Sequence, residues 1–128
     1  MDAPSFERLA AERYVSLATF RRNGTAVATP MWIAADGPNL CAVTNGTSAK
    51  MKRLKANDRV RIAACDRSGN VRGEWADGRA RRIDDPAGIA RAEAALQRKY
   101  GWQIAVLKFF SWLFGRARHR AFIEIRPA

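Results

Sequence analysis

Short polar turns recur along this chain at spacings that leave room only for brief strands. Asn23-Gly24 is the strongest local hairpin signal, because both residue types accept the positive φ angles of a tight hairpin turn. Asp36-Gly37 and Ser68-Gly69 are further turn signals. The segments between and after the turns alternate apolar and polar residues, which is typical of half-buried strands. The pattern predicts antiparallel strands at residues 14–20, 25–35, 40–45, 59–66, 71–84 and 119–127.

Helices are expected between these strands and before them. Ser5 can cap a short helix that ends near Arg13, and residues 46–57 read as a second short helix. Asp85-Pro86 starts a longer helix that ends at Gly101, and another is expected at about 103–114. The fold class is therefore mainly β with flanking helices (α+β): a six-stranded antiparallel barrel, closed or half-closed. Residues 1–128 form one domain, with a helical insertion at 86–114 before the last strand.

Charge and cysteine content narrow the classes of function. The chain has 23 Lys and Arg against 12 Asp and Glu, a net charge of +11 that attracts nucleic acid, anionic membrane or a strongly anionic small molecule. Cys41 and Cys65 lie in apolar runs without a Cys-x-x-Cys motif, and His119 is the single histidine, so a metal site is not expected. Buried free thiols and the lack of a signal peptide favour a cytoplasmic protein.

The segment from Asn45 to Asp58 breaks a local rule. Ser48 is a suitable N-cap, yet Lys50, Lys52 and Arg53 follow it where the helix dipole favours acidic residues by about 0.3–1 kcal/mol each. A bound phosphate would resolve the conflict, since backbone N–H groups and lysines at a helix start both attract anions. The alternative is a solvated basic helix that packs only its apolar side on the core.

Three stretches of this sequence resemble one known superfamily. They are YVSLATFRRNGTAVATPMWI, LCAVTNGTSAKMKRLKANDRVRIAACD and RGEWADGRARRID, and the similarity covers residues 14–84. They resemble the pyridoxamine 5′-phosphate oxidase-like proteins, and more narrowly the branch of coenzyme F420-dependent reductases. The resemblance implies a split β-barrel of the FMN-binding type, a homodimer with two cofactors at the interface between subunits.

The resemblance also implies a set of cofactor-binding residues. The residues expected to line the isoalloxazine or deazaflavin ring are Thr29, Pro30, Met31 and Trp32. The residues expected to hold the cofactor phosphate are Thr44, Asn45, Ser48 and Lys50. Two further cations, Lys52 and Arg53, would extend the basic grip toward an acidic cofactor tail.

Two departures from the pyridoxamine phosphate oxidases disfavour a vitamin B6 oxidase. Ala49 stands where those enzymes carry a basic residue beside the lysine, and AVATPMW replaces their basic, leucine-rich second strand. The expected cofactor is coenzyme F420, with FMN as the alternative. The expected activity is hydride transfer to a small conjugated acceptor, without a catalytic side chain and without a role for His119.

Several alternatives remain open at the level of sequence. Trp75, Arg79 and Arg81 share one strand face and either reach the partner subunit's cofactor or form an exposed basic edge. The aromatic segment 102–120 is either a membrane-surface helix or a helix packed on the barrel. Two alternative functions are open for the whole chain. One is a nucleic-acid-binding barrel, and the other is a cofactor carrier or sensor without turnover.

Overall fold

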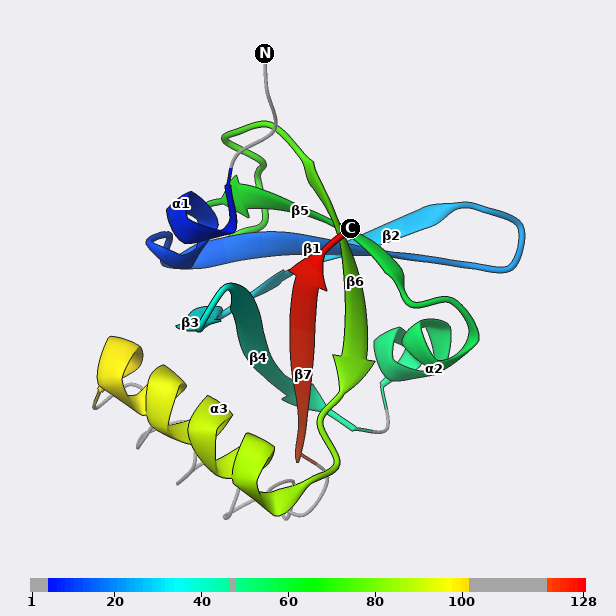
Figure 1. The fold of residues 1–128 in the computed structure, drawn as a ribbon. Coiled ribbons are helices and arrows are strands. Elements are labelled where there is room, and N and C mark those ends of the chain that lie inside the picture. The colour runs from blue at the N-terminus through cyan, green and yellow to red at the C-terminus, as the bar shows by residue number, and fades with distance from the viewer. Residues whose placement is uncertain (1–4, 47, 102–119) are drawn as a thin grey trace.

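The computed structural model shows an antiparallel sheet that curls around a core and is flanked by helices (Figure 1). The structure describes residues 5–46, 48–101 and 120–128. Within them the helices and strands are α1 Phe6–Ala10, β1 Tyr14–Phe20, β2 Ala26–Met31, β3 Ala34–Asp36, β4 Asn39–Asn45, α2 Ala49–Ala56, β5 Arg59–Cys65, β6 Ala76–Arg82, α3 Pro86–Tyr100 and β7 Arg120–Pro127.

The sheet has seven strands in the order β2-β1-β5-β6-β7-β4-β3, and neighbouring strands pair antiparallel. In Figure 1, β1, β2 and β5 run across β4, β6 and β7, as expected for a sheet that bends into a barrel. Its two edge strands, β2 and β3, are consecutive in the chain and are joined by Trp32 and Ile33 alone. The split β-barrel expected from the sequence is confirmed.

Two strand boundaries differ from the sequence-based expectation. The single strand predicted at 25–35 is two strands, because the chain leaves the β1 ladder after Met31 and joins β4 from Ala34. The count is therefore seven and not six. The strand predicted at 71–84 is shorter, since only the Cys65–Val71 bridge precedes β6.

The core of the barrel is formed by the inward rows of the strands. In β1 both faces are buried, which differs from the half-buried strand that the alternation predicted: Val15 and Leu17 lie in the barrel core, and Ser16 and Ala18 on the other face are buried as well. Further large side chains of this core come from other strands, from the bend after β2 and from two helices: Met31, Ile33, Leu40, Val60, Ile62, Ile123 and Ile125, with Phe6 and Leu9 of α1 and Met51 and Leu54 of α2. A second cluster lies between α3 and the outer face of β3, β4 and β7: Ala34, Cys41, Ile83, Ala92, Ala95, Leu96, Tyr100 and Phe122. α3 begins and ends as predicted, with Asp85 as its N-cap and Gly101 as its C-cap.

Small residues on β6 make room for α1. Gly78 faces inward, and a Cβ atom there would lie 3.0 Å from the Arg126 carbonyl oxygen and 3.2 Å from Cζ of Phe6. The strand therefore needs glycine at this position for the Phe6 ring to pack on the barrel.

The predicted helix at 103–114 lies outside the described residues. No helix in the described part of the chain is both long and apolar enough to traverse a lipid bilayer.

Candidate anion-binding site at the end of the barrel

α2 closes one end of the barrel and is held there by its two faces. Ser48 caps the helix, its side chain accepting from the N–H of Met51 as the sequence predicted. Met51 and Leu54 are buried in the barrel core. Their burial fixes the rotation of the helix and so determines where its cations point.

Lys50 and Arg53 lie on one flank of α2, three residues apart, and both reach threonines of the sheet. The Lys50 Nζ donates to Thr44 Oγ1 of β4 at 3.4 Å, and the Arg53 Nε donates to Thr19 Oγ1 of β1 at 2.6 Å. The two threonines continue the inward rows of their strands, and Thr19 is fully buried. The cations are therefore fixed by hydroxyl groups at the barrel end.

This pair of cations is not neutralised by a carboxylate in the described residues. The ion pairs there join other arginines to acids, and none includes Lys50 or Arg53. Burial, and after it the nearby charge of Arg53, lowers the pKa of Lys50 below its ordinary value. Two half-buried cations side by side make a site that favours an anion.

Thr29 adds an unused polar group to this region. It lies on β2 opposite Leu17 of β1, on the inward face, where Val27 is paired with Thr19 in the same register. Its Oγ1 is buried and has no hydrogen-bond partner among the described residues. A buried hydroxyl without a partner costs stability unless a ligand or water satisfies it.

The other residues expected along the cofactor ring have separate surroundings. Pro30 points outward, and the turn at Gly69 lies close to it: a Cβ at Gly69 would come within 3.5 Å of the Pro30 ring. Met31 is buried in the barrel core, which leaves only its backbone to line a ring. Trp32 stacks on Tyr100 of α3, with ring centroids 4.5 Å apart and an interplanar angle of 11°.

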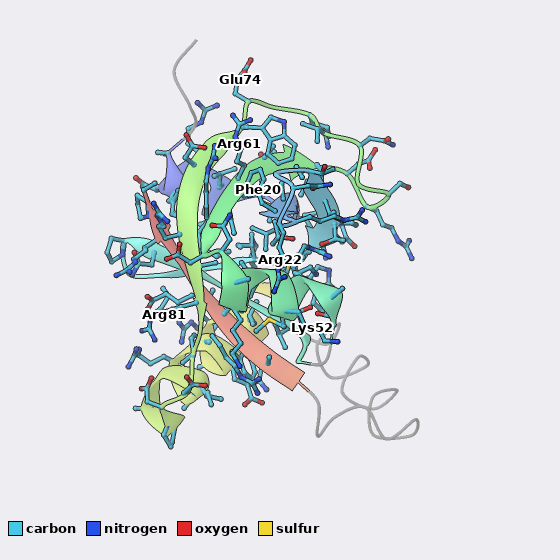
Figure 2. All side chains as sticks on the ribbon, turned by 90° about the vertical axis from the view of Figure 1, so that its right-hand side faces the viewer. Phe20, Arg22, Lys52, Arg61, Glu74 and Arg81 are labelled. Atoms are coloured by element: carbon cyan, nitrogen blue, oxygen red, sulfur yellow. The ribbon has the colours of Figure 1, made fainter. Side chains whose placement is uncertain are left out.

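Lys52 does not join the Lys50–Arg53 pair. It lies on the other flank of α2 and lines a hollow of about 630 Å³ between α2 and β6, together with Lys55 and Arg81. Figure 2 shows Lys52 and Arg81 on the side of the molecule that carries α2. The basic turn predicted as one grip is thus divided between two flanks of the helix. Asn45, also expected at the phosphate, ends β4 opposite Arg120 of β7.

The basic residues on the outer face of β5 and β6 are engaged with acids and aromatic rings. Arg79 pairs with Asp58 at 2.6 Å, and Arg81 pairs with Glu124 at 3.2 Å. The Arg61 guanidinium (labelled in Figure 2) lies 5.9 Å from the centre of the ring of Trp75, the residue immediately before β6. These contacts stabilise an exposed face at roughly 0–1 kcal/mol each.

A second stacked pair lies on the same outer face. The Arg59 guanidinium lies 4.9 Å from the centre of the Phe20 ring. A nucleic-acid-binding face would have to displace these arginines before bases could stack on the rings.

The cysteines do not contribute chemistry to the site. Burial raises the pKa of the Cys41 thiol to about 11, so this group stays protonated and unreactive. Burial also raises the pKa of Cys65. In residues 5–46, 48–101 and 120–128, His, Cys, Asp and Glu side chains do not gather in threes that would hold a metal ion.

Sequence reasoning missed Thr19, which anchors Arg53. The available signal was a threonine at the end of the apolar row that runs through Val15 and Leu17. It also missed Lys99 and Tyr100 of α3, which contact the bend between β2 and β3. Their partners are backbone atoms, which leave no mark in the pattern of side chains.

Fold and site together define a class of protein: a split β-barrel with two neighbouring cations on α2 that have no carboxylate partner in the part of the chain that the structure describes. The chain belongs to the pyridoxamine 5′-phosphate oxidase family, whose family model matches residues 3–128. A comparison with curated proteins finds no match.

Solved structures with the same fold differ in the ligands that their names give. An F420 reductase shares 23% identity with a TM-score of 0.61, covering 100% of this chain and 96% of its own. A FAD-binding protein from Mesorhizobium loti shares 23% identity with a TM-score of 0.59, covering 95% and 84%. The heme storage protein HutZ from Vibrio cholerae shares 11% identity with a TM-score of 0.68, covering 96% and 87%. At these identities the likeness establishes the fold, and the ligand must be argued from this chain's own residues.

Proposed function

We propose that this protein is a flavin-type oxidoreductase that binds coenzyme F420 through the Lys50–Arg53 pair. The observation that carries the proposal is the absence of a carboxylate partner for these two cations in the described residues. The buried and unsatisfied Thr29 hydroxyl, on the strand paired with β1, is a second group without a partner there. A cofactor phosphate would supply the missing charge and would accept hydrogen bonds from both cations.

Each residue of the site has a defined part in this proposal. Lys50 and Arg53 bind the phosphate, while Thr44 and Thr19 hold the two side chains in place. The Thr29 hydroxyl, buried on the inward face of β2 without a partner in the described residues, is available to a ligand group or a water that reaches it. The bound cofactor supplies hydride chemistry, and the chain supplies position and field. No side chain is required as a nucleophile.

The preference for the deazaflavin over FMN follows from charge. Coenzyme F420 carries a phosphodiester and an acidic tail, and this chain carries a net charge of +11. Lys52 and Lys55 form no ion pair in the described residues, so the far flank of α2 has cations available for such a tail. FMN lacks the tail and would use only the Lys50 side.

The family resemblance also leads us to propose a homodimer. A second subunit would cover the outer side of Pro30 and complete a pocket for the ring and a small conjugated acceptor. Sedimentation equilibrium of the purified protein tests this, and a monomer at all concentrations would contradict it.

Parallel titrations with coenzyme F420 and FMN test the cofactor. We expect saturable binding of both, with tighter binding of coenzyme F420 and a difference that shrinks as salt is raised, because tail contacts are screened. Equal affinities at low salt would assign the site to FMN-type ligands. No binding of either would remove the proposed function.

A further inference from the structure

The bend between β2 and β3 is the point where the barrel splits. Met31 is the last residue paired with β1, and Ala34 is the first residue paired with β4. Trp32 and Ile33 between them belong to neither ladder. The backbone of Ile33 is nevertheless buried, so its N–H and C=O need partners from outside the sheet.

Tyr100 at the end of α3 supplies one set of partners. Its hydroxyl accepts from the Ile33 N–H at 2.9 Å and donates to the Arg13 carbonyl at 2.8 Å, with the Ile33 carbonyl 3.0 Å away. Its ring stacks on Trp32. One side chain therefore fixes both the backbone and the indole of the bend.

Lys99 supplies the second set. Its Nζ donates to the carbonyls of Ala10 at 2.7 Å and Ile33 at 2.6 Å, and also to the carbonyl of Glu12. An ammonium group has three protons, and all three are used here. The side chain thus ties the end of α1 and the start of β1 to the bend.

Other charged and titratable groups face the Lys99 ammonium from several elements. Glu12 favours its charged form, as does the Cys41 thiol of β4 when it ionises, while Arg13 opposes it. The Tyr100 ring lies 5.2 Å from Nζ. The largest influence is burial, which lowers the pKa of Lys99 to about 8.

We propose that Lys99 and Tyr100 are positioning residues, which hold the backbone of residues 28–33 in the path that a cofactor ring requires. The proposal rests on the function proposed above, because it assumes that this segment lies along the ring. The β1 ladder holds residues 28–31, whereas Trp32 and Ile33 have left it, so the path of this end of the segment depends on the contacts at Ile33. Loss of these contacts would loosen the ring site and leave the phosphate site at α2 intact.

The protonation state of Lys99 should change the affinity for the cofactor ring with pH, which would not be expected of a residue with a purely structural role. A neutral Lys99 has two protons for three carbonyls and directs a lone pair at one of them. The clamp is complete below the pKa of Lys99 and weakened above it. Ring binding should therefore weaken as the pH rises through about 8, in proportion to the loss of that proton.

Two variants and one control separate the roles. Tyr100→Phe keeps the stacked ring and removes only the hydroxyl, while Lys99→Met keeps the length and removes the charge. Arg98→Met changes an exposed neighbour on the same helix. The ¹⁵N shift of the Ile33 amide reports the bend without cofactor, and titrations with coenzyme F420, FMN and inorganic phosphate report the two parts of the site.

We expect both variants to weaken coenzyme F420 on the order of tenfold, about 1.4 kcal/mol, with inorganic phosphate affinity unchanged. In the wild type the Ile33 shift should titrate near pH 8, and Lys99→Met should remove that titration. Arg98→Met should behave as the wild type. If Lys99→Met fails to fold, the Tyr100→Phe variant alone tests the positioning role, through its affinity for coenzyme F420 and the ¹⁵N shift of its Ile33 amide.

Two results would overturn the inference. In the first, the wild type binds coenzyme F420 or FMN, and the Tyr100→Phe variant binds the same cofactor with the same affinity as the wild type. This result would remove the positioning role and leave the proposed function standing. If the wild type binds neither cofactor, the proposed function fails and the positioning role falls with it, even where the Ile33 amide still titrates.

Discussion

Arg53 donates its Nε–H to the hydroxyl of Thr19, 2.6 Å away, on a side chain that is fully buried at the end of the inward row of β1. A guanidinium more often meets a carboxylate at so short a distance. A hydroxyl fixes the position of the cation and leaves its charge available to a ligand. We therefore expect Arg53 to act as a ligand-binding cation, and the first two predictions test this site.

Replacing Lys50 with alanine should weaken binding of the phosphate-bearing cofactor by about 1.5–3 kcal/mol, the range for a hydrogen bond to a charged group. Calorimetric titration of wild type and variant measures the effect. Lys55→Ala removes an equal charge from the other flank of α2 and should change FMN affinity far less. Equal losses in the two variants would indicate a general effect of net charge.

Replacing Thr19 with valine should lower the affinity for the cofactor while changing the stability of the fold very little. The variant keeps the buried shape of the side chain and removes the hydroxyl that orients Arg53. We expect the free energy of unfolding to change by less than about 1 kcal/mol, since Arg53 can turn to water, while cofactor affinity falls several-fold. Urea denaturation and cofactor titration of the same preparation provide both values. Unchanged affinity would show that Arg53 binds without this anchor.

Cofactor binding should take up protons at alkaline pH. Burial and Arg53 lower the pKa of Lys50 in the free protein, and a bound phosphate should raise it again because an opposite charge favours the ammonium form. The contribution of Lys50 to affinity is then constant while Lys50 is fully protonated, and it falls as the pH rises above the pKa of Lys50 in the free protein. Calorimetry in two buffers of different ionisation enthalpy measures the uptake.

The controls for this uptake are two methionine variants. Lys50→Met should abolish the share of proton uptake that belongs to Lys50, whereas Lys99→Met should leave that share in place. Uptake that survives in Lys50→Met and disappears in Lys99→Met would assign the effect to the clamp on the bend.

Gly78→Ala should destabilise the fold by about 1–3 kcal/mol, the usual cost of overpacking. The new methyl group would meet the Arg126 carbonyl oxygen at 3.0 Å and the Phe6 ring at 3.2 Å. Gly73→Ala is a suitable control, since its Cβ would lie 3.8 Å from that of Ala64, in ordinary contact. Thermal and urea denaturation compare the two. A loss in Gly73→Ala as large as in Gly78→Ala would refute the packing explanation.

Much of the fold could be predicted from local pattern. The strand at 14–20 and the helix at 86–100 have the predicted limits, because alternation and the Asp85 cap with Gly101 at the other end are local signals. The break after Met31 could not be predicted. Trp32 and Ile33 continue an apolar run, and their departure from the ladder depends on contacts with α3, far along the chain.

The candidate site was only partly accessible to sequence reasoning. The excess of cations after Ser48 is visible in the sequence, because it violates the preference of the helix dipole. The division between Lys50 with Arg53 and Lys52 depends on which side of α2 is buried. That rotation is set by the packing of Met51 and Leu54 in the barrel, which local spacing does not reveal.

The cations of α2 are divided between two flanks of the helix, so the residues of one flank can be substituted without changing those of the other. Under the proposed function, substitutions at Lys52 or Lys55 would change how long or how acidic a ligand the protein accepts, without disturbing the threonine-anchored pair proposed to bind its phosphate. If the proposed function holds, ligand selectivity on this scaffold can be engineered or diversified one flank at a time.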